Sequence, residues 1–144
     1  MNKTRQFKLL NLIMFLALIG ILVSGYLTYT HYTSPPDTGI CNVGEHSSCN
    51  TVNTSKYSEI FGTPVGVLGI IWFLVLAGLC SKMKQRKVII RELFSWTVIG
   101  MVFVAYFIFA ETQLFTICFY CTIVHLLVLA SFLITLGLFL KRNI

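Results

Sequence analysis

The stretch TQLFTICFYCTIVHLLVLASFLITLGLFL, residues 112–140, contains no aspartate, glutamate, lysine or arginine, and it decides the fold class. A helix needs about 20 mainly apolar residues to cross a bilayer, so this stretch is too long for a single span. We expect residues 112–120 to form a connection or the first turn of a helix. The spanning helix itself is predicted over about 119–140, beginning at the Cys-Phe-Tyr-Cys motif.

Three further stretches without acidic or basic residues have the length of one spanning helix each, namely residues 9–30, 61–81 and 93–110. The composition agrees, because 56% of the residues are hydrophobic and only 11% are charged, whereas about 25% are charged in soluble domains. Helices are expected rather than strands, since lipid offers backbone groups no hydrogen-bond partners. The sequence predicts an all-α membrane protein with a single domain over 1–144, helices at about 9–30, 63–81, 91–110 and 119–140, and a loop over 31–62.

The first apolar stretch could also be a cleaved signal peptide, because Lys3, Arg5 and Lys8 precede it. Its apolar run is longer than the usual 7–15 residues of a signal peptide, and no small-residue cleavage site follows it. We therefore expect a retained helix.

Basic residues predict the orientation, because lysine and arginine concentrate in the cytoplasmic segments of membrane proteins. Every basic residue except Lys56 lies before the first predicted helix, between the second and third, or after the fourth. We expect a multi-pass protein of the plasma or inner membrane with both termini in the cytoplasm and the loop over 31–62 outside. The net charge of +6 is thus a topology signal, and nucleic-acid binding is not expected.

The outer loop is polar and rich in turn-forming residues. Within it, residues 53–59 are predicted to form a short amphipathic helix on the membrane surface, with Tyr57, Ile60 and Phe61 directed into the membrane.

Four of the five cysteines fall on the predicted outer side, where disulfides can form. Cys118 and Cys121 are spaced so that both sulfurs lie on one face of a helix start. The partial positive charge of a helix N-terminus stabilises a thiolate, which is the reactive form of cysteine. At the outer edge of the bilayer, this pair could be reached by a lipid-soluble oxidant. The fifth cysteine, Cys80, is expected to be a small packing residue.

Cys41 and Cys49 form a second pair on the polar loop. Taken alone, their disulfide could be a structural clip. Because a C-x-x-C pair lies on the same side of the membrane, we favour a loop that carries electrons to that pair. A zinc site is not expected, since this spacing and an oxidising location are unfavourable for thiolate ligands.

The chain resembles bacterial and archaeal homologues of vitamin K epoxide reductase. SGYLTYTHY (24–32) is similar to the end of the family's first helix, and CNVGEHSSCNTVNTSKYSEIFGTPVGVLG (41–69) to its cysteine loop. CFYC (118–121) then begins the last helix, as the family's active-site motif does. The resemblance implies a stand-alone form without a thioredoxin domain, folded as a four-helix bundle around a quinone pocket that the outer loop and its short helix cap.

The resemblance also implies a relay of electrons to a quinone of the menaquinone, ubiquinone or vitamin K type. Cys41 would exchange with a separate thioredoxin-like (DsbA-like) partner, Cys49 would attack Cys118, and Cys121 would face the quinone ring. For the cofactor-binding set it implies His125, Val65 and Ser55, the serine helping to hold the loop. Vertebrate members have a hydrogen-bonding asparagine where this chain has Val65, which cannot donate. Quinone reduction is therefore expected in preference to epoxide reduction.

Two alternatives remain open at this point. One is a DsbB-type disulfide oxidase with a different relay order, although that family carries its C-x-x-C in the first outer loop. The other is a non-enzymatic membrane scaffold in which both cysteine pairs are structural.

Overall fold

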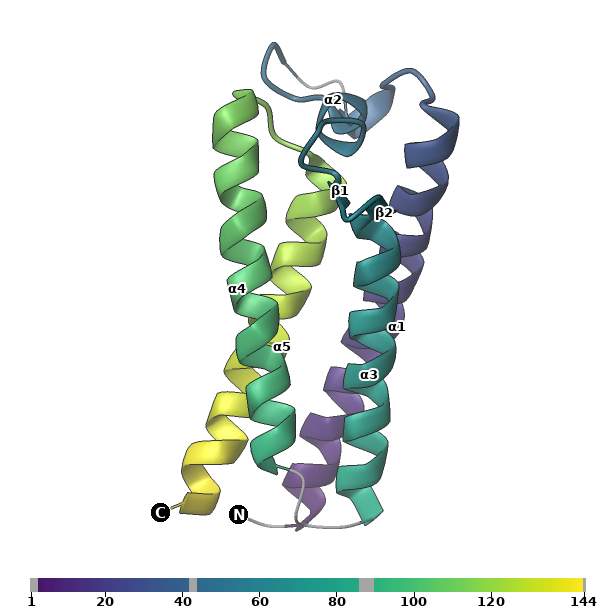
Figure 1. Ribbon diagram of the computed structural model, residues 1–144. Helices are drawn as coiled ribbons and strands as arrows, with labels where there is room; N and C mark the ends of the chain where they lie inside the picture. Colours follow the sequence, from purple (N-terminus) through teal and green to yellow (C-terminus); the bar gives the residue numbers. More distant parts are fainter. Residues whose placement is uncertain (1–2, 42–43, 86–89, 144) are drawn as a thin grey trace.

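The computed structural model describes residues 3–41, 44–85 and 90–143. Its elements follow the order α1 (Lys3–Thr33), η1 (Gly39–Cys41), α2 (Cys49–Asn53), β1 (Glu59–Ile60), β2 (Thr63–Pro64), α3 (Val65–Gln85), α4 (Ile90–Leu114) and α5 (Phe119–Asn143). The four long helices are apolar and long enough to cross a membrane. They stand side by side with both termini at one end and the loop, α2 and the hairpin at the other, here called the loop end (Figure 1).

The fold class is therefore an all-α membrane bundle, as predicted. The long helices extend beyond the predicted segments at most ends, because polar residues that were left out of the apolar windows continue the helical turns. The second span begins later than expected, at Val65, since the two preceding residues belong to strand β2.

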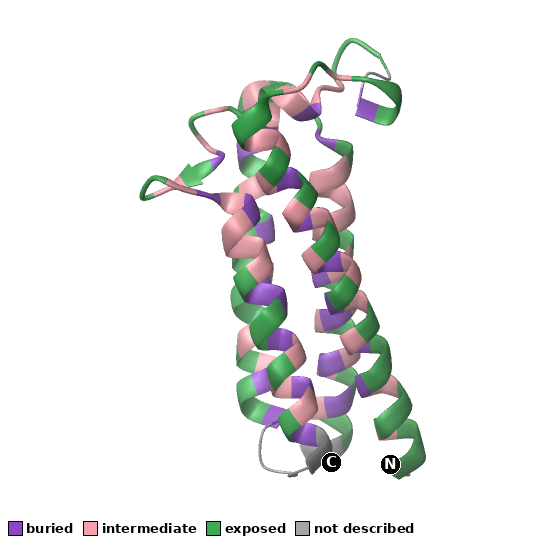
Figure 2. Cartoon of the chain, turned by 90° about the vertical axis from the view of Figure 1, so that its right-hand side faces the viewer, coloured by how far each residue is buried: buried purple, intermediate pink, exposed green. Residues whose placement is uncertain are grey.

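Helix α3 packs closely against α1 through small residues. A Cβ atom on Gly66 would lie 2.8 Å from the Thr28 amide nitrogen and 2.9 Å from the Ser24 carbonyl oxygen. Further along the same interface, the ring of Phe73 occupies the space above Gly20. Small residues let helices approach in this way within membranes. Buried positions accordingly line the inner faces of the bundle, and exposed positions lie on its outside (Figure 2).

The predicted amphipathic helix over 53–59 is wrong, because the short helix of the loop lies at Cys49–Asn53. Side chains fix this position: the Ser48 hydroxyl accepts the Thr51 amide at 3.1 Å, which is an N-cap, and the Asp37 carboxylate accepts the Asn50 amide at 2.9 Å. The Asp37 carboxylate also accepts a hydrogen bond from the Ser48 hydroxyl.

The residues after α2 turn back into a small hairpin. Strand β1 pairs with β2 in antiparallel register, Glu59 opposite Pro64 and Ile60 opposite Thr63. Phe61 and Gly62 join the strands with φ values of 53° and 75°, and positive φ at both central residues is typical of a tight type I′ turn. Phe61 is fully exposed at the tip of this turn, whereas Tyr57 is directed inward and is half-buried.

Candidate redox site

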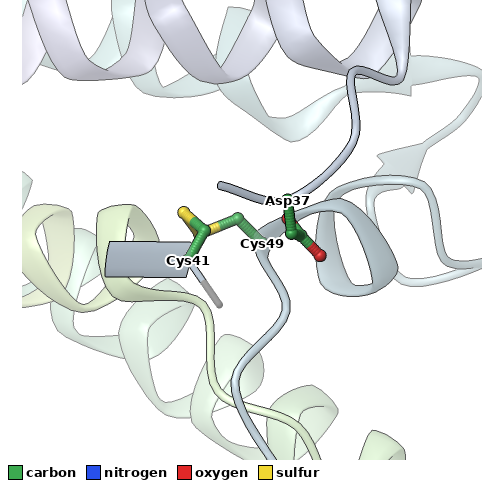
Figure 3. Close-up of side chains that lie close together, drawn as sticks. All are labelled: Asp37, Cys41 and Cys49. Carbon is green, nitrogen blue, oxygen red and sulfur yellow. A yellow bond between two sulfur atoms is a disulfide. The ribbon is translucent and has the colours of Figure 1, made fainter. Parts of the chain in front are cut away.

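The loop cysteines form a disulfide, Cys41–Cys49, with their Cα atoms 5.3 Å apart. Cys41 ends η1 and Cys49 begins α2, so the bond ties these two short elements together. Both cysteines are more than nine-tenths buried. A small polar cleft of about 110 Å³ reaches them, and Asp37 forms part of its wall (Figure 3).

Asp37 and the two loop sulfurs lie within 4.8 Å of one another, close enough to hold a metal ion. In this form of the protein the two sulfurs are bonded to each other. They therefore offer no thiolate ligand, and the cluster acts as a disulfide with a neighbouring carboxylate.

A backbone bridge brings the loop disulfide to the second cysteine pair. Ser47 pairs with Ile117, the Ile117 amide donates to the His46 carbonyl at 2.9 Å, and the Ser48 amide donates to the Ile117 carbonyl at 3.3 Å. Cys49 and Cys118 each follow this bridge directly in the chain. Cys41, Cys49 and Cys118 consequently pack in one buried cluster.

Cys118 and Cys121 are free thiols at the start of α5. Cys118 is the residue before the helix and is fully buried, and its sulfur accepts the Cys121 amide at 3.3 Å. The Cys118 amide in turn donates to Oε1 of Glu111, at the end of α4, at 3.2 Å. The Cys118 sulfur therefore lies at the N-terminus of α5 with a backbone amide directed at it.

On its other side, the pair adjoins a cavity of about 260 Å³ among the four long helices and the loop. The walls are mainly apolar, with a few polar groups near the loop end, and a cavity of this kind is typical of small-molecule sites. A cavity of about 150 Å³ already holds benzene, so this one can hold a larger ring system. Cys121 and His125 line it from α5 and Val65 from α3.

The His125 ring stacks on Phe107 of α4, with centroids 6.2 Å apart and planes inclined by 11°. Neither of its ring nitrogens forms a hydrogen bond with another residue in the part of the chain that the structure describes. Stacking fixes the plane of the ring and leaves its nitrogens available to a ligand in the cavity.

Ser55 lies outside the cavity lining, unlike Val65 and His125. Its hydroxyl donates to the Val52 carbonyl at 2.8 Å and accepts the Tyr57 amide at 3.3 Å. The structure therefore places Ser55 in the turn that follows α2, where it shapes the loop and does not face a ligand.

Asn53 and Glu111 belong to the site, although the sequence did not point to them. Asn53 is buried, and its side-chain amide donates to the Leu27 carbonyl at 2.7 Å and to Oγ1 of Thr30 at 2.8 Å. His31, to which the sequence assigned no role, contacts the Asn53 carbonyl oxygen at 2.7 Å through Nδ1. These contacts fasten the loop to α1.

Glu111 is the second such residue, lining the cavity and holding the Cys118 amide. Its sequence signal was available, since it is the one acidic residue between the last two apolar stretches.

The family model described as "Vitamin K epoxide reductase family" matches residues 11–136, a range that contains all five cysteines and His125.

Proposed function

The chain belongs to the vitamin K epoxide reductase family, which makes it an integral membrane thiol oxidoreductase, and we propose that it passes electrons from a thioredoxin-like protein to a membrane quinone. One observation carries this proposal. Cys121 lines the apolar cavity, while its neighbour Cys118 packs beside the loop disulfide. A dithiol in this position can receive electrons from the loop and deliver them to a ligand in the cavity.

The electron relay balances as a series of thiol–disulfide exchanges. A partner thiolate attacks Cys41, and Cys49 leaves as a thiolate. Cys49 then attacks Cys118 in a Cys118–Cys121 disulfide, releasing Cys121. The second partner thiol completes the partner's disulfide and frees Cys41, which re-forms its bond with Cys49 and releases Cys118. The products are a partner disulfide and a Cys118/Cys121 dithiol, the arrangement that the structure has.

The residues around the cavity suit the oxidation of that dithiol by a quinone. The quinone supplies an acceptor for two electrons and two protons, and the two thiols lose the same number as their disulfide forms. Cys121 is the sulfur in the cavity wall, and His125, one helical turn further along α5, can donate a hydrogen bond to a quinone oxygen. Val65 supplies only apolar surface. This supports quinone reduction over epoxide reduction.

The proposed orientation places the loop end outside the cytoplasm. The opposite end of the bundle carries basic residues, namely Lys3, Arg5, Lys8, Lys82, Arg91 and Lys141. In membrane proteins, the end with the basic residues faces the cytoplasm. A soluble partner outside the cytoplasm would then reach the loop disulfide through the polar cleft.

The test is quinone reduction by the detergent-solubilised protein with a reduced thioredoxin-like protein as donor. Wild-type protein is expected to turn over. Turnover by Cys121→Ser is expected to fall at least about a thousandfold, because Cys118 then has no sulfur in the cavity wall with which to form a disulfide. Cys80→Ala is the matched control, since Cys80 is buried in the core and does not line the cavity. Undiminished turnover by Cys121→Ser would overturn the proposal.

A further inference from the structure

Two tryptophans line the cavity further from the loop end, Trp72 on α3 and Trp96 on α4. Their rings stack with centroids 6.3 Å apart and planes inclined by 15°. Trp96 donates its indole N–H to the carbonyl oxygen of Trp72 at 3.1 Å. Trp72 Nε1, by contrast, is buried and has no hydrogen-bond partner in the part of the chain that the structure describes.

A buried donor without a partner is costly, and native proteins rarely retain one. Trp72 is 8% exposed, so bulk water does not satisfy its nitrogen. The indole N–H can only donate a hydrogen bond. The group that satisfies it must therefore be an acceptor, such as the carbonyl oxygen of a ligand in the cavity.

The Trp72 ring packs against α4 and against a neighbouring aromatic ring. Gly100 of α4 provides the space for it, because a Cβ atom on that residue would lie 2.8 Å from Trp72 Cε2, the ring atom bonded to Nε1. The ring of Phe73 packs edge-on at a centroid distance of 4.9 Å. Gly100 and Trp72 both line the cavity.

Trp72 also lies two helical turns beyond Val65, on the same face of α3. Val65 has no hydrogen-bond donor, so Trp72 is the residue of this face whose side chain can donate to a ligand in the cavity. His125 supplies a second donor from α5.

We propose that the Trp72 indole N–H donates a hydrogen bond to a carbonyl oxygen of the bound quinone and so determines which ligands the cavity holds. The inference rests on the proposed function and deepens it, because it names a specificity-determining contact within the same cavity. A ligand that carries an oxygen acceptor is then favoured over an aromatic hydrocarbon of the same shape.

The first test uses 15N-labelled indole groups in the oxidised, detergent-solubilised protein, which has no electrons to transfer. The chain has only two tryptophans, so two indole signals are expected, and Trp72→Phe identifies one of them. Saturation with 2,3-dimethyl-1,4-naphthoquinone should shift the Trp72 N–H proton downfield by more than the Trp96 signal. A Trp72 signal that stays in place at saturation would overturn the inference.

The second test compares two ligands that differ in their carbonyl groups. Trp72→Phe should weaken binding of the naphthoquinone about fivefold, which corresponds to the roughly 1 kcal/mol of a neutral hydrogen bond. Binding of 2,3-dimethylnaphthalene, which has no carbonyl, should be unchanged. Equal losses of affinity for both ligands would mean that Trp72 contributes only apolar surface, and this would contradict the proposal. If Trp72→Phe does not fold, Trp96→Phe identifies the remaining indole signal as that of Trp72, and the shift of that signal in the wild-type protein decides the question.

Turnover of the wild-type protein distinguishes a failure of the Trp72 contact from a failure of the proposed function. Quinone reduction with an unmoved Trp72 signal overturns the contact alone. Absence of quinone reduction, even with a small dithiol as donor, overturns the proposed function and this inference with it.

Discussion

The two cysteine pairs lie at the same end of the bundle but are held in different ways. Side-chain hydrogen bonds from Asp37 and Asn53, together with the backbone bridge to Ile117, hold α2, which begins with Cys49. Cys118 and Cys121 instead begin a helix of 25 residues, so the backbone ladder of α5 fixes their positions. One pair adjoins a polar cleft and the other an apolar cavity.

The comparison indicates which pair can move. A segment held by a few hydrogen bonds opens at a cost of a few kcal/mol, whereas the first turn of a long packed helix moves only if the helix frays or shifts. The loop pair is thus suited to leave the bundle and meet a protein, and the helix pair to remain beside the cavity.

Replacing Cys41 by serine should have the largest effect and should distinguish the roles of the two cysteine pairs. Turnover with a thioredoxin-like donor should fall at least about a hundredfold, because the partner loses the sulfur it attacks. Oxidation of dithiothreitol, which can reach the helix pair directly, should persist. A Cys49–Cys118 disulfide should accumulate and be detectable by peptide mass spectrometry. Loss of both activities would contradict the division of roles, and a Cys49–Cys121 bridge would contradict the relay order.

Replacing Asn53 by alanine should loosen the loop and leave the helix pair in place. Its side-chain amide makes two hydrogen bonds to α1, and their loss costs about 1–3 kcal/mol, or roughly 5- to 150-fold more frequent opening. Hydrogen exchange over residues 44–60 measures this. Asn50→Ala is a matched control on the same helix, because its buried Oδ1 has no partner within the described chain. Equal effects from both variants would refute the assignment.

Replacing His125 by alanine acts on the cavity side alone. Loss of one hydrogen bond to a quinone oxygen should raise the quinone KM about tenfold. Exchange between the loop disulfide and the partner should be unchanged in a single-turnover assay without quinone. An unaltered KM and rate would remove His125 from the site.

The smallest effect is expected at Glu111, the residue of α4 whose carboxylate accepts the Cys118 amide. Glu111→Gln keeps an oxygen acceptor for the Cys118 amide, so turnover should fall no more than about threefold, whereas Glu111→Leu leaves that amide unpaired and should cost more. Comparing the two rates measures the contribution of the carboxylate charge. If glutamine proved as damaging as leucine, the charge and not the hydrogen bond would matter.

The loop shows where prediction from sequence failed. Tyr57, Ile60 and Phe61 are spaced as on one face of a helix, yet the helix lies four residues before the predicted start because Asp37 and Ser48 cap it there. The Asp37 contact joins positions far apart in the chain, and local periodicity carries no information about it. The positive φ of Phe61 then commits the following residues to a hairpin.

The sequence identified part of the candidate site. Cysteine spacing and family resemblance pointed to the four sulfurs and to His125, which the structure brings to the cavity or to the disulfide beside it. Ser55 was grouped with the cofactor residues because resemblance along the chain does not tell whether a side chain faces the cavity or a turn. Asn53 and Glu111 were overlooked because a polar residue near a helix end is usually solvated.

The sequence by itself determined the four spanning helices and the order of the cysteines along the chain. It could do so because lipid forces each spanning segment to satisfy its own backbone, which makes a span a local property. Only the tertiary structure shows that a Ser47–Ile117 bridge sets Cys49 beside Cys118, that Cys121 lines a cavity, and that the indole N–H of Trp72 has no hydrogen-bond partner among the described residues. These features depend on side chains from separate helices meeting in space, and hydropathy and spacing along one chain do not encode such meetings.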